Sequence, residues 1–121
     1  MSKKEIIIDG VKYVPKTEIN MAQNTDGLPY CIVRTYSAGV HAGYVKERNG
    51  KEVKLVNSRR LWYWMGAFTL SEIAVNGVAK PDECKFAVVV PEITLTEAIE
   101  IIPCTQNSRK IIEEVKPYEV K

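Results

Sequence analysis

The amino-acid sequence predicts an α+β domain, built mainly on an antiparallel sheet with two short helices. Short β-rich segments recur between turn residues, and two helix starts follow threonine caps. The length of 121 residues, with 45% hydrophobic side chains, fits one small core. We expect an N-terminal hairpin and linker in residues 1–29 and a single compact domain in residues 30–121. The six or seven expected strands leave open a small curled barrel.

The first β-rich segment surrounds the dipeptide Asp9-Gly10. This dipeptide is a strong hairpin signal, because both central positions of the tight turn need a positive φ. We expect the hairpin over residues 6–14. Residues 17–29 mix polar and turn-forming side chains without a clear period, which is typical of a linker or loop.

Strands are predicted from β-branched and alternating segments. YCIVRTY begins the compact domain, and VHAGYVKER leads through the turn Asn49-Gly50 into KEVKLVN. Around that turn apolar and charged side chains alternate, which predicts one buried and one solvated face. KFAVVVPEI is predicted as a buried strand that stops at Pro91. EAIEIIP is predicted as another strand, and the final YEVK could add an edge strand.

Two helices are predicted from their caps. Thr69 and Glu72 form a capping box, in which each side chain satisfies a free backbone N–H of the other residue, so a helix is expected over residues 70–76. The second helix begins at Thr105 in TQNSRKIIEEV, and Pro117 lies just beyond its expected end.

Charge and cysteine content narrow the class of protein. The net charge is +2, but residues 1–60 carry eleven Lys/Arg and six Asp/Glu (+5), whereas residues 61–121 carry six and nine (−3). This asymmetry favours an anion-facing side, although solvated surface charge is the commoner explanation. Three widely spaced cysteines without a CxxC indicate semi-buried thiols in a reducing compartment. With no long apolar run, we expect a cytoplasmic protein.

Catalytic and metal-binding signals are weak. His41 is the one histidine, so neither a triad nor a zinc pair can be built around it. The clusters Glu97/Glu100 and Glu113/Glu114 are typical of solvated faces rather than of acid/base pairs. We therefore expect a protein that is not an enzyme and that uses no metal and no cofactor.

The most basic and the most aromatic parts of the chain are adjacent in NSRRLWYWMGAFTLSE. Arg59 and Arg60 could hold a phosphate, and Trp62 or Trp64 could stack on a nucleobase. In an extended strand the two indoles would share one face. The alternative is that one face belongs to the core and the other packs against a neighbouring subunit.

The TYSAG turn is a second candidate, because it offers backbone amides and hydroxyls at a strand end as an anion cradle. Glycines in such a strand more often mark a bulge or bend. Arg34 leads into this turn and could converge with the arginine pair. The full set of candidate ligand-binding residues is Arg34, Tyr36, Ser37, His41, Asn57, Ser58, Arg59, Arg60, Trp62 and Trp64.

Residues 30–115 resemble a family of small uncharacterised proteins encoded by tailed bacteriophages and prophages, carried as a domain of unknown function. The strings RTYSAGVHAGY and NSRRLW-W-GA-TLS carry the resemblance. It implies a non-structural accessory protein in the cytoplasm of an infected or lysogenic bacterial host. Such proteins often block host defences, for example by sequestering a cyclic oligonucleotide or an ADP-ribose-like signal in pockets of a homo-oligomer.

Three binding functions stay open from the sequence. The first is sequestration of a small anionic nucleotide ligand by a homo-oligomer, which needs arginines and stacking rings but no catalysis. The second is a single-stranded nucleic-acid-binding module, against which the small net charge argues. The third is a protein-interaction module that inhibits a host enzyme through its aromatic face. None of the three involves a membrane.

Overall fold

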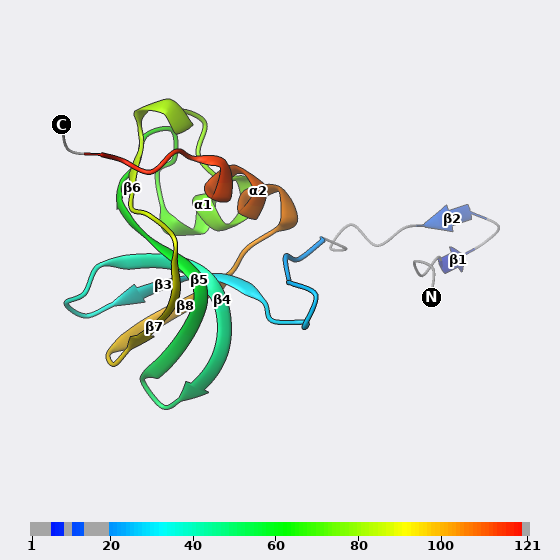
Figure 1. The fold of residues 1–121 in the computed structure, drawn as a ribbon. Coiled ribbons are helices and arrows are strands. Elements are labelled where there is room, and N and C mark those ends of the chain that lie inside the picture. Colours follow the sequence, from blue (N-terminus) through cyan, green and yellow to red (C-terminus); the bar gives the residue numbers. More distant parts are fainter. Residues whose placement is uncertain (1–5, 9–10, 14–19, 120–121) are drawn as a thin grey trace.

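The computed structural model describes residues 6–8, 11–13 and 20–119. Within them, six strands form one antiparallel sheet, and two helices lie side by side at one end of it (Figure 1). This arrangement confirms the α+β class. No helix in these ranges is long and apolar enough to cross a membrane.

The strands of the main sheet are β3 (Tyr30–Thr35), β4 (Val40–Asn49), β5 (Glu52–Tyr63), β6 (Lys85–Phe86), β7 (Val90–Leu95) and β8 (Ala98–Pro103). The helical segments are α1 (Leu70–Asn76), the short 3₁₀ turn η1 (Pro81–Glu83) and α2 (Gln106–Glu114). The strand order is β6-β5-β4-β3-β8, and β7 pairs with β5 along the same edge as β6.

The sheet does not close into the small barrel that the sequence left open. Strand β7 pairs with β5 and β8 pairs with β3, and no ladder joins β7 to β8 within the described ranges. The two strands are consecutive in the chain, but each completes a different edge. The structure is therefore an open sheet.

The N-terminal hairpin is confirmed by β1 (Ile6–Ile8) and β2 (Val11–Tyr13), which pair antiparallel. Its turn residues, and the residues from 14 to 19, lie outside the described part of the chain. The end of the predicted linker packs on the compact domain. Ala22 is buried, and its N–H donates to the carbonyl of Cys104 at 2.9 Å.

Both helices begin and end close to where the caps predict. Thr69 Oγ1 accepts from the N–H of Glu72, and Thr105 Oγ1 accepts from the N–H of Ser108. The capping box is only half formed, because the carboxylate of Glu72 accepts from the N–H of Phe68 instead of that of Thr69.

The strand prediction for residues 85–93 is wrong. KFAVVVPEI is not one strand but two, β6 and β7, and Pro91 lies inside β7 rather than at its end. Strand β7 lies on an edge, where the missing N–H of a proline costs no ladder bond. No strand forms at residues 118–119, and residues 120–121 lie outside the described part.

Strand β5 is longer than predicted and carries two bulges. The first places Asn57 and Ser58 together opposite Gly43 of β4, with Asn57 in the left-handed region at φ 49°. A Cβ at Gly43 would lie 2.8 Å from the Cα of Ser58, so only glycine leaves room for this register. The second bulge places Trp62 and Tyr63 opposite Lys85 of β6. Each extra residue reverses the facing of the side chains that follow it.

The apolar interior has two parts. The larger lies between the helices and the face of the sheet that they cover, and it includes Tyr30, Ile32, Leu61, Ile73, Phe86 and Ile112. The smaller lies on the opposite face of the sheet, since its residues alternate with those of the larger along β3, and includes Cys31, Val33, Val53, Leu55 and Leu95. All three cysteines are buried and free, which confirms the prediction of unpaired thiols.

Candidate functional site

An open groove of about 220 Å³ runs along the β6 edge of the sheet. Three segments build it: the end of β5, strand β6 with the residue after it, and the segment that follows α2. The lining residues are Arg60, Trp62, Lys85, Phe86, Ala87 and Tyr118. The groove therefore combines aromatic surface with two cations.

The second bulge of β5 explains the aromatic cluster. In a regular strand Trp62 and Tyr63 would point to opposite faces, but here both lie opposite Lys85. The ammonium of Lys85 lies 5.4 Å from the ring centroid of Trp62, 5.7 Å from that of Tyr63 and 5.0 Å from that of Tyr118. These distances are within the range of cation–π attraction. Lys85 is thus held in the middle of three partly exposed rings.

The far wall of the groove is the segment after α2, which runs beside β6 (Figure 1). Pro117 forms a parallel bridge with Phe86, and the N–H of Tyr118 donates to the carbonyl of Phe86 at 2.9 Å. Nothing in the sequence pattern of this segment predicts a site. Tyr118 is half exposed and completes the cluster around Lys85.

Arg60 and Trp62, both predicted, are brought together in the groove. Trp62 is 69% exposed and Arg60 is also exposed. No carboxylate in the described ranges forms an ion pair with Arg60 or Lys85. Arg60 and Lys85 therefore have no carboxylate partner among the described residues, and Lys85 instead lies against the exposed ring of Trp62.

Arg59, expected to hold a phosphate beside Arg60, is instead buried, with 2% of its surface exposed. The bulge at Asn57 turns it towards the helices, where its guanidinium donates to three backbone carbonyls. Burial lowers the pKa of Arg59, whereas Tyr30 and Glu113 raise it. The expected arginine pair is thus divided between the interior and the surface.

Ser58 and His41 are also buried and cannot reach a ligand in this structure. Ser58 Oγ has no hydrogen-bond partner, and Nε2 of His41 lies 2.9 Å from the carbonyl oxygen of Ala38. Burial lowers the pKa of His41, and the nearby charge of Arg60 lowers it further, although the contact with Ala38 opposes both effects. His41 is therefore an interior histidine with a backbone partner, and it is more deeply buried than the surface or half-buried position expected of a lone histidine.

The depressed pKa of His41 predicts a pH-dependent stability. The unfolded chain binds a proton near the ordinary value of 6.5, whereas the folded chain resists it, so this stabilisation is complete above pH 6.5 and is lost on acidification. We expect the midpoint of urea unfolding to fall between pH 7 and pH 5.5. The variant His41→Gln removes the one histidine and should flatten this profile. An equal fall in the variant would assign the pH dependence to other groups.

The TYSAG turn does not form the expected anion cradle. The N–H of Ala38 donates to Thr35 Oγ1 at 2.8 Å, and the N–H of Tyr36 donates to the carbonyl of Glu97 at 2.9 Å. Ser37 Oγ lies 3.5 Å from the carboxylate of Glu97, which would repel an anion. Two amides of the turn are therefore already bonded within the protein, one of them to Glu97 between β7 and β8.

The remaining predicted residues lie outside the groove. Arg34 forms an exposed ion pair with Glu100 at 3.0 Å, on the β3–β8 side of the sheet. Asn57 is exposed at the first bulge of β5. Trp64 lies just past the end of β5 and is half-buried against the larger core, so the two indoles do not share one exposed face.

Sequence reasoning missed Lys85 and Tyr118. Lys85 begins the segment that the sequence predicts as one buried strand. Tyr118 lies in a segment that pairs with Phe86, 32 residues earlier in the chain. A cation beside an apolar run and a tyrosine after a proline are common on any surface. Only the pairing of this segment with β6 makes the two residues neighbours.

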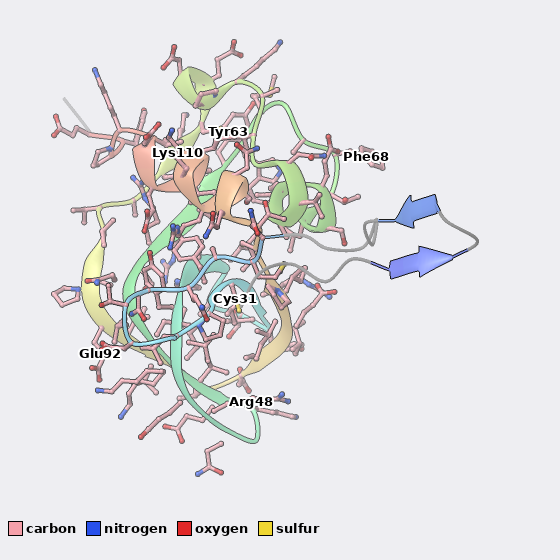
Figure 2. The ribbon with its side chains drawn as sticks, turned by 90° about the vertical axis from the view of Figure 1, so that its right-hand side faces the viewer. Cys31, Arg48, Tyr63, Phe68, Glu92 and Lys110 are labelled. Carbon is pink, nitrogen blue, oxygen red and sulfur yellow. The ribbon has the colours of Figure 1, made fainter. Side chains whose placement is uncertain are left out.

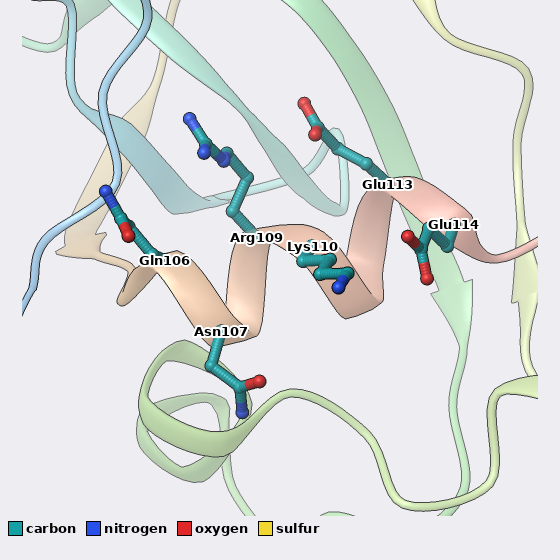
Figure 3. Close-up of a pocket in the computed structure, with 6 residues that line it drawn as sticks. All are labelled: Gln106, Asn107, Arg109, Lys110, Glu113 and Glu114. Carbon is teal, nitrogen blue, oxygen red and sulfur yellow. The ribbon is translucent and has the colours of Figure 1, made fainter.

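A second hollow of about 360 Å³ lies along α2 and is lined by Gln106, Asn107, Arg109, Lys110, Glu113 and Glu114 (Figure 3). Arg109 and Glu113 project from the same side of the helix. Both already have partners in the chain, since Arg109 donates to the carbonyl of Gln23 and Glu113 accepts from the hydroxyl of Tyr44, each at 2.8 Å. Two of its charged side chains are therefore already bonded within the domain, and the groove at β6 is the stronger candidate.

Fold and site together define a small α+β domain that presents an aromatic, cationic groove at one edge of an open sheet. The chain belongs to the family described as "Domain of unknown function (DUF6948)", whose model matches residues 28–112. No curated protein and no solved structure matches the chain.

Proposed function

We propose that this protein is a non-catalytic binding protein, whose groove at β6 takes a planar, anionic ligand of the nucleotide type. The observation that carries the proposal is that Trp62, an exposed indole, lines one groove together with the cations Arg60 and Lys85. A nucleotide needs both features, a flat apolar surface for its base and positive charge for its phosphate.

Each side chain of the groove has a distinct role in this proposal. The base stacks on the exposed ring of Trp62, with Tyr118 as the opposite wall. Arg60 binds phosphate oxygens through its planar guanidinium, which can donate two parallel hydrogen bonds. Lys85 adds a point charge that the surrounding rings hold in place.

The size of the groove limits what one subunit can hold. A volume of about 220 Å³ is below the roughly 300–1,000 Å³ of pockets that enclose a drug-sized ligand. One base fits, and the rest of a larger nucleotide would extend beyond the groove. We therefore propose that a second copy of the chain covers the ligand in a homo-oligomer.

Sequestration is the biological role that follows from this proposal. A binder without catalysis can lower the free concentration of a cyclic oligonucleotide or an ADP-ribose-like defence signal. The resemblance to phage and prophage proteins in RTYSAGVHAGY and NSRRLW-W-GA-TLS supports an anti-defence role of this kind. The role makes no demand on a nucleophile or a metal.

Isothermal titration tests the proposal. We expect heat of binding with at least one member of a panel of nucleoside monophosphates, cyclic di- and trinucleotides and ADP-ribose. The double variant Arg60→Gln, Lys85→Gln should weaken that binding at least tenfold, and added salt should weaken binding to the wild type more than to the variant. No heat with any member would overturn the proposal.

A protein-interaction module is the second candidate, because apolar surface continues beyond the groove. Val88 and Val89 follow the lining residue Ala87 and are 62% and 43% exposed. Aromatic residues beside exposed aliphatic ones are common at the centre of protein interfaces. This function would be favoured if no nucleotide of the panel gave heat of binding and if a protein partner bound tightly and lost that binding in Trp62→Ala.

A further inference from the structure

The guanidinium of Arg59 joins the segments from which the groove is built. Its Nε donates to the carbonyl of Ala87 at 2.8 Å, and Ala87 lines the groove. Its NH1 donates to the carbonyls of Ile112 and Val115 at 2.9 and 2.7 Å, where α2 ends. The buried guanidinium of Arg59 thus connects the residue after β6, which lines the groove, to the end of α2. The segment that follows α2 forms the far wall of the groove.

The same cation lies against the floor of the groove. The guanidinium carbon is 5.5 Å from the ring centroid of Phe86, which lines the groove and whose carbonyl accepts from the N–H of Tyr118. The chain from Val115 to Tyr118 is therefore fixed at both ends, by Arg59 at the helix end and by β6 at the tyrosine. Loss of the first contact should leave this segment held at one end only, by the bond of Tyr118 to Phe86.

The electrostatics agree with a positioning role. The last carbonyls of a helix carry partial negative charge, and a cation placed there is stabilised. The NH2 of Arg59 is buried without a partner, so the side chain is held by three bonds in a site that does not satisfy all of its donors. Only a planar, branched cation reaches carbonyls on two sides at once.

We infer that Arg59 is a positioning residue of the binding site, which sets the distance between Trp62 and Tyr118 without touching the ligand. The expected loss of affinity rests on the proposed function, whereas the expected movement of the Tyr118 segment does not. A ligand that contacts both rings binds less well when the far wall moves, because the wall must then be ordered during binding.

The first test uses Arg59→Lys, which keeps the charge but cannot span the three carbonyls. We expect the variant to fold, to shift and broaden the NMR signals of the Tyr118 ring and the Trp62 indole, and to bind the best nucleotide of the panel at least tenfold more weakly. Ser58→Ala is the matched control, because Ser58 is an equally buried neighbour whose hydroxyl has no partner. Unchanged Tyr118 and Trp62 signals in a folded Arg59→Lys would overturn the inference.

Two further measurements keep the inference testable if the variant unfolds or if no nucleotide binds. In the wild type, the Nε–H of Arg59 should exchange with water far more slowly than that of the exposed Arg60, and exchange at equal rates would contradict the bond to Ala87. In Arg59→Ala, millimolar methylguanidinium should restore the Tyr118 signal, and failure in a folded variant would also count against the inference. Both readouts are independent of any ligand, so they separate this inference from the proposed function.

Discussion

Replacement of Trp62 by alanine is expected to weaken binding of the nucleotide-type ligand about 5- to 150-fold, because stacking of a base on an aromatic ring contributes about 1–3 kcal/mol. The fold should survive, since the indole is 69% exposed and contributes little to the core. Isothermal titration against the best ligand of the panel gives the affinity, and the far-ultraviolet circular dichroism spectrum checks the fold.

Phe68 provides the control for this change. It is 91% exposed, and Figure 2 shows it projecting away from the body of the molecule, outside the groove. Phe68→Ala removes a similar amount of exposed aromatic surface and should leave affinity unchanged. Equal losses in Trp62→Ala and Phe68→Ala, or no loss in either, would place the ligand elsewhere.

Substitution of Gly43 by alanine is expected to destabilise the fold by about 3 kcal/mol or more. The added Cβ would lie 2.8 Å from the Cα of Ser58 and 3.4 Å from the carbonyl oxygen of Val56, so β4 and β5 could not keep their register. Overpacking of a well-packed core costs about 1–3 kcal/mol, and here both of these close atoms belong to the backbone, which cannot rotate away as a side chain can. Equilibrium unfolding in urea measures the loss in free energy.

Gly50→Asn is the control that distinguishes a steric clash from the mere loss of a glycine. Gly50 has φ 65°, which asparagine tolerates, and a Cβ there would meet nothing within 4 Å, so we expect a change of less than about 1 kcal/mol. The double variant Gly43→Ala, Ser58→Gly should recover part of the lost stability, because it removes the Cβ of Ser58. A fully stable Gly43→Ala would contradict the close approach of the two strands.

Much of the fold was predictable because its signals are local. The cap at Thr69 satisfies backbone groups within one turn of helix, and the turn that Asn49-Gly50 predicts, which the structure places at Gly50 and Lys51, depends on the positive φ of Gly50. Alternation of apolar and charged residues around that turn gave the paired strands β4 and β5. The strand at Pro91 was placed wrongly because edge and central strands differ in their neighbours, not in their own sequence.

The site was predictable only in part. The adjacency of arginines and tryptophans correctly singled out Arg60 and Trp62 as neighbours on one surface, but it could not divide Arg59 from Arg60. That division depends on a bulge at Asn57, which forms where Gly43 of another strand lets the backbones approach. A bulge has no reliable signature within its own strand, because the residue opposite it decides whether it fits.

The sequence by itself determined the class of fold, the caps of both helices, the paired strands around the Asn49-Gly50 turn and the unpaired state of the cysteines. The tertiary structure alone decided which arginine is buried, that Trp62 and Tyr63 both lie opposite Lys85, and that Tyr118 completes the groove. The physical reason is the separation along the chain between the residues that make the stabilising contacts. Caps and turns are stabilised by neighbours in the chain, whereas register, bulges and groove walls are stabilised by contacts between segments that only the folded chain brings together.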